Sequence, residues 1–285
     1  MSKTSIFLGL VCVFLWGLTF PLIKFLMLAG TPPLGMVALR FFLGFILFIP
    51  FVPAPKNEWL GLGLLSLTLF SLPLALTNYA IAHLDSAIVA LASQLEVPFA
   101  WLLSVIFLKE GVTRRQGLGL VISFLGIYLL TMTNEVASVD NIHALVLLVF
   151  VSFLYGMASI QLKFLRSNPA TITVWSFFFS FLLTGLGAAL YEPWEEITRV
   201  FSPVNFGITA LLAALSMFAF YLWTHLLAKN EVNAVVPFIM LVPISTLCFA
   251  YLLLGETTEL SAQLGGLVTL VGVALQTIAP QKKTA

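Results

Sequence analysis

Apolar runs of membrane-spanning length follow one another along almost the whole chain, and no other feature limits its fold as strongly. A helix needs about 20 predominantly apolar residues to cross a bilayer. Cutting the sequence at its proline, glycine and charge clusters leaves ten such runs, at residues 5–27, 33–52, 59–82, 86–108, 116–133, 143–165, 171–190, 204–227, 232–254 and 260–279. With 60% hydrophobic and 9% charged residues, the chain has too little polar surface to coat a soluble globule of its size. The sequence therefore predicts an all-α membrane protein with ten transmembrane helices.

The basic residues indicate how these helices are oriented. Lys and Arg near the ends of transmembrane helices stay preferentially on the cytoplasmic side. If the N-terminus is inside, ten of the thirteen Lys and Arg residues fall at inside ends, whereas only Arg199 falls in an outside loop. The remaining two, Lys24 and Arg40, lie within the first two runs. We therefore expect a multi-pass protein with both termini cytoplasmic.

The second half of the chain repeats the first. The stretches Leu84–Glu110 and Asn230–Glu256 each carry a central Val-Pro pair and end in an acidic residue, and a shift of 145 residues superposes the two pairs. Further matches are Gly119 and Gly126 with Gly265 and Gly272 at a shift of 146, Trp16, Gly17 and Lys24 with Tyr155, Gly156 and Lys163 at 139, and Pro33 with Pro169 at 136.

Each half holds five of the ten runs, so the second copy enters the membrane from the opposite side. We expect two five-helix units, residues 1–138 and 139–285, related as an inverted repeat by a pseudo-two-fold axis in the membrane plane. Proteins built in this way bind substrate near the midplane and work by alternating access, as one half rocks against the other.

Taken together, these features resemble the drug/metabolite transporter superfamily, EamA type. The resemblance covers essentially the whole chain. It rests on the five-plus-five repeat, the start WGLTFPLIK at Trp16, the ALRFFLG stretch around Arg40, and the LKE and LGE ends of the fourth and ninth runs. It implies an inner-membrane carrier, often an exporter of amino acids or related metabolites, with a central cavity between the halves.

Glu96 is the leading candidate for a functional side chain. It lies about ten residues from the end of its run, or roughly 15 Å into the membrane, where ionisable groups are costly and usually face a cavity or a partner. On one continuous helix, Ser93 and Ala100 would share its face. We expect Glu96 to couple transport to protons or to bind a substrate ammonium, and the structural alternative is an ion pair with Arg40.

Arg40 lies about seven residues into the second run from its outside end. Its planar guanidinium can hold a carboxylate with two hydrogen bonds. That carboxylate could belong to an amino-acid substrate or to Glu96, and the structural pairing is favoured. Ser176 occupies the matching position of the other half, so a charge at this depth belongs to one half only.

Aromatic and amide side chains supply the other candidates for substrate binding. Trp16, Phe20 and Lys24 follow one another at helical spacing, and Tyr155 begins the matching stripe in the second half. Such a stripe is more often packing than a ligand site, although an aromatic ring near the midplane can stack on a substrate ammonium. We expect Lys24 to snorkel to the lipid headgroups. The remaining candidates are Asn78, Tyr79, Ser93, Gln94 and Tyr221, although such polar groups also bridge helices.

The chain contains no HExxH, CxxC, Walker-type or GxGxxG motif, so we expect no catalytic residue, metal or cofactor. A net charge of +1 argues against a nucleic-acid partner. We expect a secondary transporter of small metabolites, surrounded by membrane lipid, with an amino acid or a derivative as the exported substrate. Efflux of drugs or cationic compounds is the alternative, and an enzyme embedded in the membrane is a third reading. A homodimer remains open.

Overall fold

The computed structural model describes residues 2–108, 113–130, 132, 139–162, 164–229 and 236–277, and the regular structure in these ranges is helical throughout. The α-helices are α1 (Lys3–Leu28), α2 (Pro33–Phe48), α3 (Trp59–Leu65), α4 (Leu72–His83), α5 (Ser86–Ser93), α6 (Glu96–Leu108), α7 (Arg114–Leu130), α8 (Val139–Leu162), α9 (Pro169–Tyr191), α10 (Trp194–Ile197), α11 (Pro203–Lys229), α13 (Val242–Leu254) and α14 (Leu260–Thr277). Three 3₁₀ segments, η1 (Ile49–Phe51), η4 (Thr198–Phe201) and η5 (Val236–Leu241), and one π-helical segment, η2 (Ser66–Ser71), complete the regular structure.

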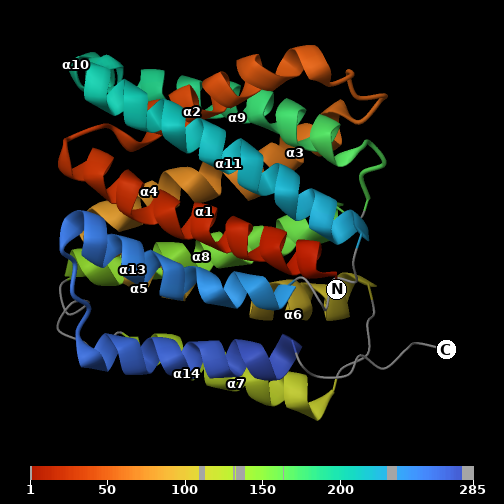
Figure 1. Ribbon diagram of the computed structural model, residues 1–285, viewed down its shortest axis with the longest axis vertical. Coiled ribbons are helices and arrows are strands. Elements are labelled where there is room, and N and C mark those ends of the chain that lie inside the picture. Colours follow the sequence, from red (N-terminus) through yellow and green to blue (C-terminus); the bar gives the residue numbers. More distant parts are fainter. Residues whose placement is uncertain are drawn as a thin grey trace.

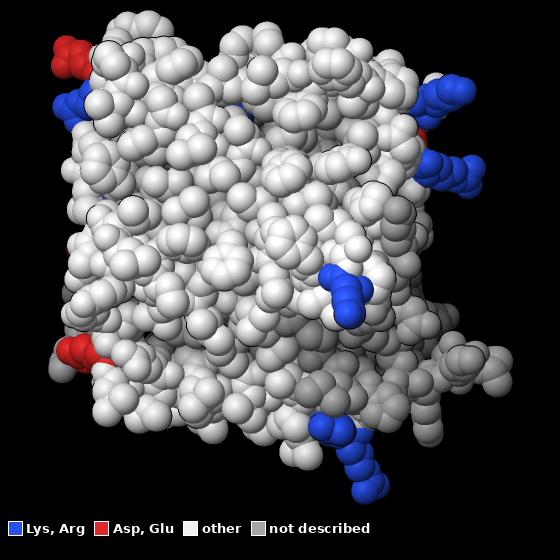
Figure 2. Space-filling view, viewed as in Figure 1, with Lys and Arg blue, Asp and Glu red and all other residues white. Residues whose placement is uncertain are grey.

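The long helices run side by side between two opposite ends of the bundle (Figure 1). Figure 2 shows charged side chains at or near these two ends, some basic ones lying inward from the right edge, with a broad uncharged area between them. Within the described ranges, seven helical stretches are long and apolar enough to cross a membrane. The expected fifth, ninth and tenth runs form shorter helices, α7, α13 and α14. The all-helical, apolar architecture predicted from the sequence is therefore confirmed.

The fourth expected run forms one helical stretch, Ser86–Phe107, which a turn at Gln94 and Leu95 divides into α5 and α6. Pro98 has no N–H to donate to the carbonyl of Gln94, and its ring crowds that carbonyl, so a regular α-helix cannot continue through this point. The backbone N–H of Val97 bonds to the Gln94 carbonyl instead, at 3.2 Å. As a result α5 ends at Ser93 and α6 begins at Glu96. The regular α-helix is therefore interrupted at Gln94 and Leu95, between Ser93 and Glu96.

The ninth expected run changes in the same way at its own Val-Pro pair. The 3₁₀ segment η5 ends at Leu241, and α13 begins with Val242 and Pro243. Two interrupted helices, matched in the sequence repeat, therefore have their breaks beside equivalent prolines. The residue that corresponds to Glu96 is Leu241, so only the first interruption carries a carboxylate.

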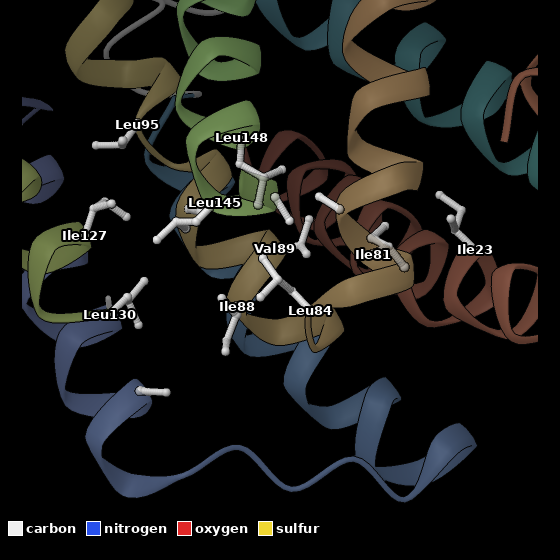
Figure 3. Packing of buried hydrophobic residues seen from close by; sticks show 14 of the residues in the cluster. Ile23, Ile81, Leu84, Ile88, Val89, Leu95, Ile127, Leu130, Leu145 and Leu148 are labelled. Atoms are coloured by element: carbon white, nitrogen blue, oxygen red, sulfur yellow. The ribbon is translucent and has the colours of Figure 1, made fainter. Parts of the chain in front are cut away.

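The largest buried hydrophobic cluster surrounds α5 and joins it to α1, α4, α7 and α8 (Figure 3). Residues 86–92 are at most 3% exposed, whichever side of the helix they occupy. Contacts from α1, α4, α8, α13 and α14 enclose the helix. In contrast, the last turn of α6 is exposed at Ile106 and Phe107. The protein is thus packed densely around the first half of this interrupted run.

Glycines allow four helices to pack at very short distance. A methyl group at Gly17 of α1 would lie 2.6 Å from the Cβ of Ser245 in α13, and one at Gly156 of α8 would lie 2.8 Å from the backbone nitrogen of Ala100 in α6. Because real carbon atoms do not approach this closely, glycine is required at both positions.

The α7–α14 pair is in contact through glycines along its length. A methyl group at Gly126 would lie 2.8 Å from the Gly265 carbonyl oxygen, and one at Gly272 would lie 2.7 Å from that of Gly119. In both contacts a side chain would meet backbone, which cannot rotate out of the way. The two helices are therefore held together backbone against backbone.

Candidate functional site

Glu96 lies at the first residue of α6, directly after the break. Its side chain is half-buried. The backbone N–H groups that follow it are bonded, that of Val97 to the Gln94 carbonyl at 3.2 Å and that of Phe99 to the Leu95 carbonyl at 3.1 Å. Glu96 is therefore a carboxylate at a kink within an otherwise apolar helical stretch. Ionisable side chains at such a depth usually face a cavity or a partner.

Arg40 is held by the other half of the chain. It is 5% exposed on α2, and its Nε and Nη2 both donate to the hydroxyl of Ser216 in α11, the first at 3.0 Å. Ser216 in turn donates to the carbonyl of Leu212. The third guanidinium nitrogen, Nη1, has no hydrogen-bond partner in the described part of the chain, and no Arg40–Glu96 ion pair forms there. Arg40 thus keeps one donor edge unused.

Tyr155 connects the two charged residues. Its phenol lies close enough to Glu96, Arg40 and Thr77 to interact with them electrostatically. The four residues come from α8, α6, α2 and α4, and α8 packs against both α4 and α6. We refer to Tyr155 and the two charged residues within its electrostatic range, Arg40 and Glu96, as the polar group.

Two buried amides flank this group in the sequence. Asn78 follows Thr77 and is fully buried, while Gln94 is 2% exposed at the helix break. Neither amide atom of Asn78, nor the Oε1 of Gln94, has a protein partner among the described residues. A buried polar atom without a partner costs about 1–3 kcal/mol. These amides are therefore suited to form hydrogen bonds with a polar ligand.

The remaining candidates lie elsewhere. Trp16 packs edge-on against Trp223 of α11, with ring centroids 5.1 Å apart, and Phe20 packs against the large core cluster. Tyr79 is 37% exposed and stacks on His83, and Tyr221 is 57% exposed on α11. Ser93 donates to the carbonyl of Val89 in its own helix. These contacts of Trp16, Phe20 and Tyr79 are with residues other than Glu96, whereas Ser93 lies three residues before Glu96, at the end of α5.

Lys24 does not reach the headgroups, and the snorkelling prediction is wrong. It is 9% exposed, and its Nζ donates to the backbone carbonyl of Leu84 at 2.8 Å. Asp85 and Glu256 lie within electrostatic range of the ammonium. A carbonyl at the end of a helix together with two carboxylates offsets the loss of hydration, which explains why the side chain stays inside.

Sequence reasoning also missed two carboxylates that bond to the starts of distant helices. Glu192 accepts from the backbone N–H groups of Leu34 and Gly35 at 2.7 and 2.8 Å, and burial raises the pKa of its carboxyl. Glu58 accepts from Arg166 and Ser167 just before α9, and these hydrogen bonds lower its pKa. In both cases the carboxylate and its backbone partners lie far apart in the sequence, so no local sequence pattern predicts these hydrogen bonds.

Among the described residues, two surface hollows are lined entirely by residues outside the predicted site. The larger, of about 640 Å³, lies between the segments before α3 and α9 and includes Lys56 and Arg166. The smaller, of about 290 Å³, is an apolar groove between α2, α9 and the short segment α10–η4. The polar group around Glu96 is separate from both.

An apolar helical bundle with interrupted helices and an internal polar group is the construction of a secondary transporter. The chain belongs to the EamA-like transporter family, whose model matches it twice, over residues 3–132 and 142–278. It is thus a multi-pass membrane transporter of this family.

Similar proteins cover nearly the whole chain. An uncharacterized transporter of Archaeoglobus fulgidus is 26% identical over 97% of this chain and 98% of its own length. A protein of Salmonella typhimurium named "Probable amino-acid metabolite efflux pump" is 28% identical over 95% of this chain and 93% of its own. A solved crystal structure with 16% identity matches 98% of both chains with a TM-score of 0.64, which supports the fold alone.

Proposed function

We propose that the protein exports an amino acid or a close derivative across the inner membrane by alternating access, with Glu96 as the proton-coupling residue. The observation that carries this proposal is the placement of Glu96 at a mid-run helix start, with Tyr155 within electrostatic range of both Glu96 and Arg40. A zwitterion needs an anionic and a cationic partner at once. Glu96 meets the ammonium, and the unused Nη1 of Arg40 meets the carboxylate.

Asn78 and Gln94 complete the proposed site. Their unpartnered amide atoms bind the polar groups of the substrate, and filling them removes the cost of leaving buried polar atoms unpaired. The name of the Salmonella relative supports an amino-acid metabolite as the substrate class. At 28% identity that name guides the choice of substrates to test.

The proposed mechanism also rests on an inverted repeat of residues 1–138 and 139–285. The separate matches of one family model to the two halves support it. So do the glycine contacts. Gly17 meets Ser245, and its counterpart Gly156 meets Ala100, the counterpart of Ser245 at the shift of 145 residues. Each half thus makes the same contact on the other.

We place both termini in the cytoplasm. Lys3 lies at the start of α1, and Lys56 and Arg166 follow the helices α2 and α8, which return toward that end, whereas Arg199 donates to Gly30, just after the other end of α1. This distribution agrees with the excess of basic residues on the cytoplasmic side of membrane proteins. The end of the bundle where α1 finishes then faces outward.

Transport in proteoliposomes tests the proposal. A panel of radiolabelled amino acids is loaded into vesicles, and efflux is followed with and without a pH gradient for the parent protein and Glu96→Gln. We expect the gradient to accelerate efflux in the parent but not in Glu96→Gln, because the amide cannot exchange a proton. Glu195→Gln, which changes an exposed carboxylate, is the matched control and should behave as the parent. Equal gradient-driven efflux in Glu96→Gln would contradict the coupling role.

Efflux of cationic compounds is a second candidate, because Glu96 has no Arg40 ion pair in the described structure and the Tyr155 phenol lies within electrostatic range of it. A carboxylate next to a phenol suits an organic cation. This function predicts that lipophilic cations, rather than amino acids, move in the same vesicles and that Arg40→Gln leaves their transport intact. Loss of cation transport in Arg40→Gln would favour the zwitterion instead.

A further inference from the structure

The tight turn between α4 and α5 is held by charges from two other parts of the chain. The Lys24 ammonium of α1 donates to the carbonyl of Leu84, at the end of α4. The Glu256 carboxylate, between α13 and α14, accepts from the backbone N–H of Ser86, at the start of α5, at 3.0 Å. We call this arrangement of Lys24, Leu84, Ser86 and Glu256 the junction clamp.

Each charge in the junction clamp has the sign that its helix end requires. Carbonyl groups at a helix C-terminus carry partial negative charge and favour a cation, whereas N–H groups at an N-terminus favour an anion. Lys24 serves the first need and Glu256 the second. Asp85, between the two helix ends, lies within electrostatic range of both charged residues. The turn is therefore bound on one side by α1 and on the other by the C-terminal half.

The junction clamp lies where the bundle is most tightly closed. Directly after it, α5 is buried on all sides, and Figure 3 shows Leu84, Ile88 and Val89 within the core at this point. The helix leads from the clamp to the break at Glu96. A path from this end of the bundle to Glu96 requires a helix that surrounds α5 to move away from it, and two of these helices, α1 and α13, are tied to the turn by the clamp.

We propose that the junction clamp is the outer gate of the transporter, and that opening toward the outside requires its release. This inference rests on the proposed function for its orientation. The clamp joins α1 and the α13–α14 connection, so it holds elements from both halves of the chain at once. Its bonds exist only while this end is closed, which stabilises the closed conformation relative to the open one.

Chemical labelling of a reporter cysteine tests the gate without any substrate. In a background of Cys12→Ala and Cys248→Ala, Ser93→Cys places a thiol at the last residue of α5, next to the break. A membrane-impermeant maleimide is then added from the outside to right-side-out vesicles, or from the cytoplasmic side to inverted ones. We expect Lys24→Met to raise the outside labelling rate at least tenfold and to lower the rate from the cytoplasmic side.

Two further variants keep the test decisive. Glu256→Gln retains an oxygen that can accept from Ser86 but removes the charge that faces Lys24, so it should also raise outside labelling and can replace Lys24→Met if that variant fails to fold. Glu192→Gln is the matched control. Glu192 is another half-buried carboxylate at the same end of the bundle, but it bonds to the start of α2 and is not part of the clamp. This variant should label as slowly as the parent.

The possible results separate cleanly. Slow outside labelling in both clamp variants overturns the gate, as does equally fast labelling in Glu192→Gln, which would show that any lost carboxylate loosens this end. A rise confined to the cytoplasmic side overturns the outward assignment. If labelling behaves as expected but no amino acid or cation moves in the vesicles, the gate stands and only the proposed substrate fails.

Discussion

A single methyl group at Gly17 is expected to destabilise the protein through the contact between α1 and α13. The added Cβ would lie 2.6 Å from the Cβ of Ser245 and 3.0 Å from its backbone carbonyl carbon. Side-chain rotation cannot remove the second contact, so the helices must separate. Overpacking of this kind costs about 1–3 kcal/mol, which corresponds to roughly a 5- to 150-fold change in the folding equilibrium.

The same substitution at Gly156 should have a similar effect, because the new Cβ would lie 2.8 Å from the backbone nitrogen of Ala100 and 3.0 Å from the Cβ of Phe99. Gly117→Ala is the matched control. No atom lies within 4 Å of its added methyl group, so alanine should be neutral or should stabilise α7 by up to about 1 kcal/mol through helix propensity.

Reversible unfolding in mixed detergent micelles measures all three variants on one scale. Gly17→Ala and Gly156→Ala should unfold at lower denaturant than the parent, and Gly117→Ala at the same or a higher concentration. If the first two unfold with the control, the helices tolerate a wider separation than their packing indicates, and the assignment of these glycines as obligatory contacts is refuted.

Two other changes probe polar contacts. Ser216→Ala removes the acceptor for two Arg40 nitrogens. Because a hydrogen bond to a charged group is worth about 1.5–3 kcal/mol, this variant should unfold at a lower denaturant concentration in the same assay. Ser216→Thr, which keeps a hydroxyl, should unfold close to the parent. An unchanged midpoint in Ser216→Ala would exclude this anchor. Hydrogen bonds from Ser167 and Arg166 lower the pKa of Glu58, so its contribution to stability is present above the ordinary glutamate pKa of about 4.3 and is lost as the pH falls through the lowered pKa. Amide hydrogen exchange around Ser167, corrected for its intrinsic rate, should then accelerate in acid. In Glu58→Gln the corrected exchange rate should no longer change as the pH passes the pKa of this carboxyl. Identical pH profiles in the parent and the variant would contradict the role of Glu58 at Ser167.

The positions of the helices could be predicted from the sequence because apolar runs, and the proline, glycine and charged residues that separate them, are local signals. The run at 59–82 corresponds to the helical stretch Trp59–His83, and the run at 171–190 to Pro169–Tyr191. The break before Glu96 was also accessible in principle, since Pro98 stands four residues after Gln94. Its effect was underestimated because a proline can bend a membrane helix without ending it.

The partners of the charged residues could not be predicted in this way. Arg40 was paired with Glu96 as the structural option, yet the described structure bonds it to Ser216. Serine is common in apolar helices, so nothing in the sequence singles out Ser216. Lys24 was expected at the membrane surface because a lysine near a helix end usually reaches water. The acceptor that holds it, the carbonyl of Leu84, becomes available only when α1 and α4 pack together.

The contact between α7 and α14 bears on how such a chain could arise. Gly126 meets Gly265, and their counterparts Gly272 and Gly119 meet each other, so the same surface faces itself across the contact. Self-complementary contacts of this kind are the hallmark of symmetric dimers. If the two halves form the inverted repeat proposed above, two separate copies of a half-length ancestor would already make this interface. Fusion of the genes would then have fixed the ratio of the two halves and the orientation of each. Either half could afterwards change without the other, and Glu96, whose counterpart is Leu241, is an example of such a difference.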